Sequence, residues 1–287
     1  MPELPEVERA RRLLADHALD RTIVDVDDRD EFVTRPHRPG ELRSALTGRT
    51  LTAAHRRGKS MWLTTSPNGT DTDGPDLGIH LGMGGVLVVR DADGSVFLDG
   101  DPNPTARPTV DDGPYGAASR AAGPHKPEWD RFVLRFADGG TLALFDKRRL
   151  GRVRLDPAVD GLGPDALGLP RARFRDRMGR STAPVKARLL DQSVLAGVGN
   201  LLADEALWRA KIHPATPVSE LDDPAMDRLH RSLKGALDDA IAQGGVHTGR
   251  VIPARVKGGR CPRCRAAMEH GTVGGRSTWW CTREQVR

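Results

Sequence analysis

The sequence predicts an α+β protein of two domains, with an antiparallel β-sandwich at the N-terminal side and a helical domain at the C-terminal side. Three observations predict it: short strand-like segments separated by turn residues fill residues 22–155, helical periodicity dominates from residue 184, and cysteines cluster near the C-terminus. A chain of 287 residues with 38% hydrophobic residues can form two separate cores, and a single domain is the second choice.

The N-terminal half is expected to begin with a helix and to continue as strands. Pro5 opens the helix, and its apolar residues share one face: Val7, Ala10, Leu13 and Leu14. Strands are expected at 22–28, 51–65, 77–90 and 95–99, and at 131–137 and 141–146 around a Gly-Gly turn. The proline-rich residues 100–127 are expected to form a surface loop.

The C-terminal half is expected to be helical after a boundary rich in Gly, Pro and Arg at 156–183. Helices are predicted at 184–196 and 200–210, with Asn200 as the N-cap of the second, and a longer helix runs from Pro224 to Gly244. The expected division is 1–155, 156–250 and 251–287.

The positive charge of the chain is local. The formal net charge is +5, but residues 251–287 carry eight Lys or Arg against two acidic residues, which is +6, so the rest sums to −1. A second group places five cations within eight residues: Lys147, Arg148, Arg149, Arg152 and Arg154. Such groups suit a polyanion such as nucleic acid, and the alternative is a pair of solvated basic faces.

The sequence predicts a cytoplasmic protein. The N-terminus is acidic where a signal peptide would be basic, and no apolar run is as long as a membrane span. Three cysteines form no even disulfide set, which suits a metal site in a reducing compartment.

The N-terminus itself is a candidate nucleophile. Removal of Met1 would leave Pro2 with a secondary amine beside Glu3 and Glu6. An α-amine titrates near pH ~8, so a useful fraction is neutral and nucleophilic, and Glu3 could move protons. The alternative is that these residues only cap the first helix.

Several motifs resemble one family in order along nearly the whole chain. Residues 2–8 resemble the start of the formamidopyrimidine-DNA glycosylase and endonuclease VIII (Fpg/Nei) family, in which the N-terminal proline is the nucleophile. Residues 56–59 are similar to a hairpin with a catalytic-site lysine, here Lys59. Residues 80–85 resemble the segment whose methionine, here Met83, enters the duplex, and residues 146–151 resemble the loop that fills the gap left by an extruded nucleotide.

The resemblance continues into the C-terminal half. Residues 186–192, residues 196–200 and Glu205 are similar to the family's helix–two-turns–helix module, and residues 275–281 to a zinc-finger hairpin whose arginine, here Arg276, grips a phosphate. The implied fold is a β-sandwich domain followed by a helix–two-turns–helix domain with a zinc-finger-like β-hairpin.

The resemblance implies a bifunctional DNA glycosylase and abasic-site lyase that acts as a monomer on damaged double-stranded DNA. Pro2 would attack C1′ of an extruded nucleotide, Glu3 would assist ring opening, and β,δ-elimination would cut the strand without a cofactor. The other implied roles are phosphate orientation by Lys59, a wedge of Met83, Arg149 and Leu150, and DNA contacts by Lys186, Asn200 and Arg276.

Two departures affect recognition. The family usually has phenylalanine at Leu150, so stacking is lost while apolar volume is mostly kept. Only fifteen residues separate Gly245 from Cys261, which is short for a capping loop over 8-oxoguanine. Oxidised pyrimidines, ring-opened purines and abasic sites remain open as preferred lesions. For Met83 and Leu150, the alternative is an ordinary place in the core.

The predicted metal site departs from four cysteines at one position. Cys261-x2-Cys264 is followed by sixteen residues and by Cys281-x2-Glu284, so a carboxylate stands where the fourth cysteine is expected. Carboxylate oxygen can bind zinc, and a structural zinc with these ligands is the expectation. The alternatives are His270 as the fourth ligand, a water molecule in that place, or a metal-free hairpin held by tryptophan packing.

Two other functions remain open from sequence alone. One is a damage-recognition protein that keeps the DNA clamp without activity, which the changes at Leu150 and Glu284 suggest. The other is an RNA-binding module, which would have no use for extrusion and wedge elements.

Overall fold

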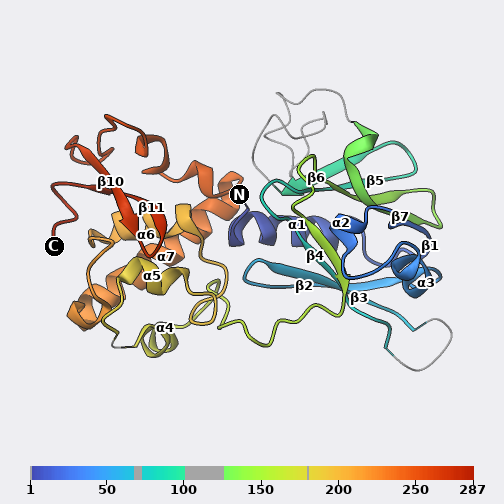
Figure 1. Cartoon of the computed structure of the whole chain (residues 1–287), viewed down its shortest axis with the longest axis horizontal. Coiled ribbons are helices and arrows are strands. Elements are labelled where there is room, and N and C mark those ends of the chain that lie inside the picture. The colour runs from blue at the N-terminus through green and yellow to red at the C-terminus, as the bar shows by residue number, and fades with distance from the viewer. Residues whose placement is uncertain (1, 68–72, 101–125, 180) are drawn as a thin grey trace. The chain divides into compact units, whose positions relative to one another are not determined.

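The computed structural model describes residues 2–67, 73–100, 126–179 and 181–287, and it divides into two compact units (Figure 1). The first holds Pro2 and Glu6–Val159, and the second holds Glu3–Pro5 and Asp160–Arg287. The first is a sandwich of antiparallel sheets and the second is helical with one β-hairpin, which confirms the predicted fold class. The finer division with 251–287 as a separate part stays a prediction.

Two sheets form the first unit. The five-stranded sheet runs β1 (Ile23–Asp27), β7 (Asp130–Phe136), β8 (Thr141–Phe145), β5 (Val86–Arg90) and β6 (Val96–Gly100). The four-stranded sheet runs β2 (Leu51–Arg57), β3 (Ser60–Thr65), β4 (Leu77–His80) and β9 (Arg152–Leu155). Neighbouring strands pair antiparallel throughout.

One core joins these sheets to helix α1 (Leu4–His17). Val7, Ala10, Leu13 and Leu14 of α1 are buried together with apolar residues of both sheets, so the predicted apolar face of the helix is confirmed. Two short helices, α2 (Glu31–Thr34) and α3 (Glu41–Leu46), lie between β1 and β2 in the chain, and the 3₁₀ turn η3 (Pro127–Trp129) precedes β7.

Two of the predicted strands are each two strands. Residues 51–65 form the hairpin β2–β3, because Gly58 takes a left-handed conformation with φ 61° and reverses the chain. Residues 77–90 contain β4 and β5, which belong to different sheets and are separated by a turn at Gly82 (φ 60°). Strand β9 was not predicted. Of the expected loop 100–127, residues 101–125 lie outside the described residues.

The second unit contains α4 (Arg171–Met178), α5 (Val185–Leu190), α6 (Asn200–Ala210) and α7 (Asp223–Gln243). Short 3₁₀ turns η4 (Val218–Glu220), η5 (Val246–Thr248) and η6 (Ile252–Ala254) lie between the later elements. Helix α4 was not predicted, and α5 is shorter than the expected 184–196. The helix pair α5–α6 and the end of α7 at Gly244 (φ 104°) agree with the prediction.

The C-terminal hairpin packs on α6. It consists of β10 (Met268–Val273) and β11 (Arg276–Cys281), drawn red beside α6 in Figure 1. Trp208 of α6 is buried in one cluster with Val251, Cys261, Met268 and Cys281. The hairpin therefore shares a core with the helix. Among the described helices, none has the length and apolar composition of a membrane span.

An ion cluster around the buried Glu8 fixes the β2–β3 turn to α1. Glu8 accepts hydrogen bonds from Arg11, Arg12 and Arg56 at 2.9–3.0 Å, and Arg56 donates to the Gly58 carbonyl at 2.9 Å. Burial by itself raises the pKa of Glu8, but the three arginines outweigh it and lower that pKa from 4.5 to about 2. The turn that carries Lys59 is thus held to α1 by the ion pair between Glu8 and Arg56.

We predict that acid destabilises the protein through Glu8. Because the folded pKa lies below the unfolded one, the stabilisation is complete above about pH 4.5 and is lost as pH falls through about 2. A shift of this size corresponds to about 3 kcal/mol at most. Glu8→Gln should therefore lower the free energy of unfolding at pH 7 and flatten its fall between pH 4.5 and 2, measured by urea unfolding at several pH values.

The exposed Glu31→Gln is the control for a lost carboxylate and should leave the acid limb unchanged. Equal acid slopes for wild type and Glu8→Gln would contradict the assignment.

Candidate functional site

The start of the chain is anchored on the N-terminus of α6. The Glu3 carboxylate accepts the backbone N–H groups of Leu201 at 2.9 Å and Leu202 at 3.1 Å, and the Leu4 N–H donates to the Gly197 carbonyl at 3.2 Å. Glu3 is buried, with 1% of its surface exposed. A carboxylate is favoured at a helix N-terminus by the free N–H groups and the helix dipole. Pro2 is bonded to Glu3, so this anchor restricts the position of the candidate nucleophile.

Two glycines make room for this anchor. A Cβ atom on Gly199 would lie 2.2 Å from the Glu3 carboxyl carbon, and one on Gly197 would lie 2.5 Å from a Leu4 methyl carbon. Gly197 also has φ 106°, which side-chain-bearing residues rarely adopt. The Gln192 amide holds the same turn, since its oxygen accepts the Gly197 N–H and its nitrogen donates to the Leu190 and Val198 carbonyls, all at 2.9 Å.

The structure corrects the expected phosphate site at this turn. Asn200 is the first residue of α6 and Gly199 is the N-cap, so Asn200 does not cap the helix. The N–H groups expected to meet a DNA oxyanion are already bonded to Glu3. The buried side-chain oxygen of Asn200 has no hydrogen-bond partner among the described residues, so this amide is not committed to a structural role there.

Lys186 is an internal support, which revises its expected DNA contact. It is fully buried, and its Nζ lies 2.6 Å from an Asp204 carboxylate oxygen. The same Nζ donates to Thr278 Oγ1 at 2.7 Å and to the Ser277 carbonyl at 3.1 Å. The ammonium group thus has one ion pair and two hydrogen bonds. Burial lowers the pKa of Lys186, and the charge of Asp204 opposes that effect. The ion pair therefore joins α5, α6 and β11.

Arg276 lies beside the tip of that hairpin. It is exposed, and among the residues the structure describes it has no ion pair. The turn before it uses Gly274 (φ 58°) and Gly275 (φ 72°), and a Cβ on Gly274 would come within 2.7 Å of the Ala187 side chain. Lys186 holds the backbone next to Arg276, so an exposed cation is presented from a fixed base.

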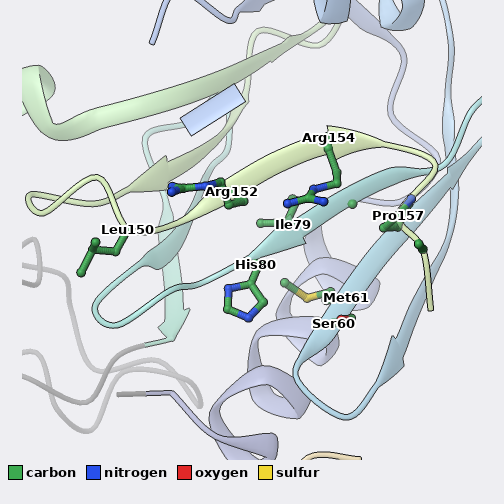
Figure 2. A pocket seen from close by; sticks show the side chains of 10 residues that line it. Ser60, Met61, Ile79, His80, Leu150, Arg152, Arg154 and Pro157 are labelled. Atoms are coloured by element: carbon green, nitrogen blue, oxygen red, sulfur yellow. The ribbon is translucent and has the colours of Figure 1, made fainter. Parts of the chain in front are cut away.

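In the first unit, Lys59 stands in the β2–β3 turn beside a basic pocket of about 400 Å³. Figure 2 shows His80 near Ser60 and Met61, with Arg152 and Arg154 on the neighbouring strand and Leu150 and Pro157 at opposite ends. Partial burial of its ring, and then the positive charges of Lys59 and Arg154, lower the pKa of His80. The neutral form of this histidine is thus favoured first by burial and then by the cations around it.

The expected wedge residues are exposed. Met83 is 47% exposed and Leu150 is 37% exposed, so neither belongs to the core, and the alternative of core filling is excluded. Their turns touch, because a Cβ on Gly82 would lie 2.3 Å from the Leu150 carbonyl oxygen, and the Arg148 side chain donates to the Met83 carbonyl.

The buried Asp146 carboxylate organises the wedge loop. It accepts the backbone N–H groups of Arg148 at 2.9 Å and of Leu150 and Gly151 at 2.7 Å. Sequence reasoning placed Asp146 in the family motif without a role. Its signal was an acidic residue next to a run of cations, because such a residue can hold the backbone of the loop that presents them.

A cluster that could hold a metal ion lies at the base of the hairpin. The ligand atoms of Cys261, Cys264, Cys281 and Glu284 all lie within 4.8 Å of one another. His270 lies outside this cluster and pairs with Ser277 at 2.9 Å, so it is not the fourth member. Three sulfurs and one carboxylate oxygen at these separations fit a tetrahedral site.

The surroundings act differently on the cluster's ligands: burial raises the pKa of Cys281 to about 11, whereas the pKa of Cys261 is lowered. The Trp208 indole N–H donates to Cys261 Sγ at 3.3 Å. Burial raises the pKa of Cys261, but the hydrogen bonds from Trp208 and from backbone N–H groups outweigh burial and bring this pKa to about 7. Glu284 lies 2.8 Å from Arg263 and 3.3 Å from Lys211. Trp208, Arg263 and Lys211 were not singled out from sequence, because their link to the cysteines exists only in the fold.

Comparison with known proteins agrees with this geometry. Residues 1–153 match the formamidopyrimidine-DNA glycosylase N-terminal domain, and residues 162–250 match the formamidopyrimidine-DNA glycosylase H2TH domain. A formamidopyrimidine-DNA glycosylase of Chloroflexus aggregans is 34% identical over 310 aligned residues, covering 100% of this chain and 99% of that protein.

The chain belongs to the formamidopyrimidine-DNA glycosylase family. Solved structures of the Lactococcus lactis Fpg protein are similar throughout. One, in complex with DNA containing an abasic site, has a TM-score of 0.74 at 27% identity and covers 99% of this chain and 100% of its own. Another, with DNA containing an oxidised pyrimidine, has a TM-score of 0.74 at 28% identity and covers 100% of both chains.

We predict that Gly199→Ala disrupts the anchor of Glu3 with little strain in the backbone. The backbone of Gly199 (φ −115°, ψ −170°) is open to alanine, but the new methyl group would displace the carboxylate from the N-terminus of α6. Two charge-assisted hydrogen bonds would be lost, at roughly 1.5–3 kcal/mol each. Melting temperature by calorimetry should fall, and any activity that depends on the N-terminus should fall with it.

Gly235→Ala is the matched control. It lies within α7, its added Cβ would meet only an Arg209 nitrogen at 3.5 Å, and alanine should stabilise the helix by about 0.5–1 kcal/mol. If Gly199→Ala behaved like Gly235→Ala, the anchor would be of no consequence.

Proposed function

We propose that this chain is a bifunctional DNA glycosylase and abasic-site lyase of base excision repair, with Pro2 as the nucleophile. Family membership supports the activity. The observation that carries the proposal is the Glu3 anchor, because it holds the residue after Pro2 on a rigid helix in a chain that has the family's N-terminal motif.

The mechanism begins with the neutral Pro2 amine. Its nitrogen attacks C1′ of the extruded nucleotide, and the damaged base leaves with the electrons of the glycosidic bond and takes up a proton. The nitrogen loses its proton, the sugar ring opens, and an iminium ion joins protein and sugar. Glu3, the residue after Pro2 in the chain, moves the proton during ring opening. β-Elimination and then δ-elimination release the phosphates on the two sides of the sugar.

The other residues bind and shape the DNA. Lys59, Asn200 and Arg276 contact phosphates that flank the lesion, while Met83, Arg149 and Leu150 occupy the space that the extruded nucleotide leaves. The exposure of Arg276, Met83 and Leu150 supports these roles. Lys186 supports the Arg276 hairpin from within.

The substrate is double-stranded DNA with an oxidised base or an abasic site, bound by a monomer in the cytoplasm. The Lactococcus lactis relatives were solved with DNA that contains Fapy-dG, an oxidised pyrimidine or an abasic site. These three lesions form the first panel to test. Leu150 and Glu284, two of the departures from the family pattern, motivate the rival function of a damage-binding protein without activity.

We also propose that the cysteine cluster holds a structural zinc with Glu284 as the fourth ligand. Three thiolates and one carboxylate around Zn²⁺ leave a net charge of −2, and Arg263 and Lys211 lie against the carboxylate to balance it. When bound, zinc would fix the hairpin that carries Arg276 and would take no part in the chemistry.

The catalytic proposal predicts a covalent adduct at Pro2. Incubating the protein with an abasic-site duplex and borohydride should trap the iminium as an amine, and mass spectrometry should place the sugar on residue 2. Pro5→Ala changes the other proline of the motif and should still give the adduct, whereas blocking the Pro2 amine by retention of Met1 should abolish it. Lack of an adduct in protein shown to have lost Met1 would favour the binding-only function.

The metal proposal predicts one zinc per chain by elemental analysis. Glu284→Ala should lower the zinc content or raise the dissociation constant by about tenfold or more, since a ligand is lost. His270→Ala is the control and should keep the metal, because this side chain lies outside the cluster. Stoichiometric zinc at unchanged affinity in Glu284→Ala would show that the carboxylate is not a ligand.

A further inference from the structure

Arg149 is held by residues that precede it by more than a hundred positions. Its Nη2 and Nε donate to the same oxygen of Asp30 at 2.6 and 3.1 Å. Its guanidinium carbon also lies 5.5 Å from the centre of the Phe32 ring. Both partners belong to the segment that begins α2, and no motif of the sequence singles that segment out.

The Asp30 side chain is itself fixed. Its Oδ1 accepts the N–H of Val33 at 3.3 Å as the N-cap of α2, and its other oxygen lies 3.7 Å from Arg131. Arg131 donates from Nε to the Asp146 carbonyl at 2.9 Å, and the Asp146 carboxylate holds the loop that contains Arg149. The contacts form a closed ring from Asp30 through Arg131 and Asp146 back to Arg149. The start of α2 and the loop that contains Arg149 are therefore held together.

Phe32 is an exposed aromatic ring among three cations. It is 43% exposed, and the guanidinium carbons of Arg35, Arg152 and Arg149 lie 4.1, 4.9 and 5.5 Å from its centre. Like charges repel at such separations, but the negative face of an aromatic ring offsets part of the repulsion. Arg152 also donates to the Arg149 carbonyl at 3.2 Å. The ring therefore organises the cations next to the wedge loop.

Arg149 needs such support. Its φ of 57° lies in the left-handed region, which is unfavourable for a residue with a side chain. The side chain is 46% exposed, so without partners it would sample many rotamers. An arginine discriminates between bases only when its planar donors are held in one direction.

We infer that Asp30 and Phe32 are positioning residues that fix the direction of Arg149 and thereby set its preference for the base opposite the lesion. This inference rests on the proposed function, in which Arg149 enters the space beside that base. The family pattern usually places an aromatic side chain at the neighbouring position, where this chain has Leu150. Phe32 supplies an aromatic contact to the same loop from a different segment.

The test compares rates of borohydride trapping, under single turnover, on duplexes with an abasic site opposite C, G, A or T. The readout is the ratio between the trapping rate on the fastest duplex and that on the slowest duplex. Arg149→Ala should bring the ratio close to one. Asp30→Asn keeps the helix cap, Phe32→Leu keeps apolar volume, and each should lower the ratio about two- to fivefold, the range expected for an exposed ion pair or cation–π contact.

Two controls make the test specific. Phe32→Tyr keeps the aromatic face and should keep the ratio. Asp25→Asn, on β1, weakens ion pairs with Arg135 of β7 and Arg43 of α3 and should leave the ratio unchanged. If Asp30→Asn lowers the melting temperature, the comparison of Phe32→Leu with Phe32→Tyr alone decides the test. The inference would be overturned, and the proposed function kept, if Arg149→Ala altered the ratio while Asp30→Asn and Phe32→Leu kept the wild-type ratio.

An unaltered ratio in Arg149→Ala would overturn it as well, while trapping by the enzyme persisted. Loss of trapping in the wild type is a different result, because it would remove the proposed function and the inference together.

Discussion

The bond between the Glu3 carboxylate and the N-terminus of α6 is the interaction on which the candidate site depends. A helix N-terminus is a ready anion site, and here the chain's own third residue occupies it. Gly197 and Gly199 are required because any larger residue would collide with Glu3 or Leu4. Because the backbone donors of this turn are already used, we propose that side chains such as Arg276 bind the phosphates of DNA.

Two exposed residues for which we propose DNA contacts stand on buried polar supports. The two residues after Arg276, Ser277 and Thr278, accept hydrogen bonds from the buried Lys186. The backbone N–H of Leu150 donates to the buried Asp146 carboxylate. A buried charge is costly unless it is fully paired, and both supports are paired several times. The contacts of each support offset the cost of its burial. They also fix the backbone that carries the exposed side chain, which recognition of a distorted duplex requires.

Sequence patterns predicted the elements that local signals determine. Short stretches of sequence predicted the apolar face of α1 and the helix α7 that ends at Gly244. The spacing of the candidate metal ligands was equally clear from the sequence: Cys261, Cys264, Cys281 and Glu284. The patterns did not separate β4 from β5, because a continuous apolar run does not say to which sheet each half belongs. They also misplaced Lys186, because a lysine is buried only when a distant partner, here Asp204, meets it in the fold.

Helix α6 links the cysteine cluster, which is remote in sequence from Pro2, to the anchor of Glu3. Its first turn binds the Glu3 carboxylate, Asp204 in its middle pairs with Lys186, and Trp208 near its end donates to Cys261. The helix has eleven residues and a length of about 16 Å, so these three contacts lie along one rigid rod. Loosening of the cysteine hairpin would free Trp208 and the partners of Lys186 together. The structural support of the Arg276 side and of the N-terminal anchor is therefore shared, which gives a structural zinc a physical reason to matter for chemistry in which it has no part.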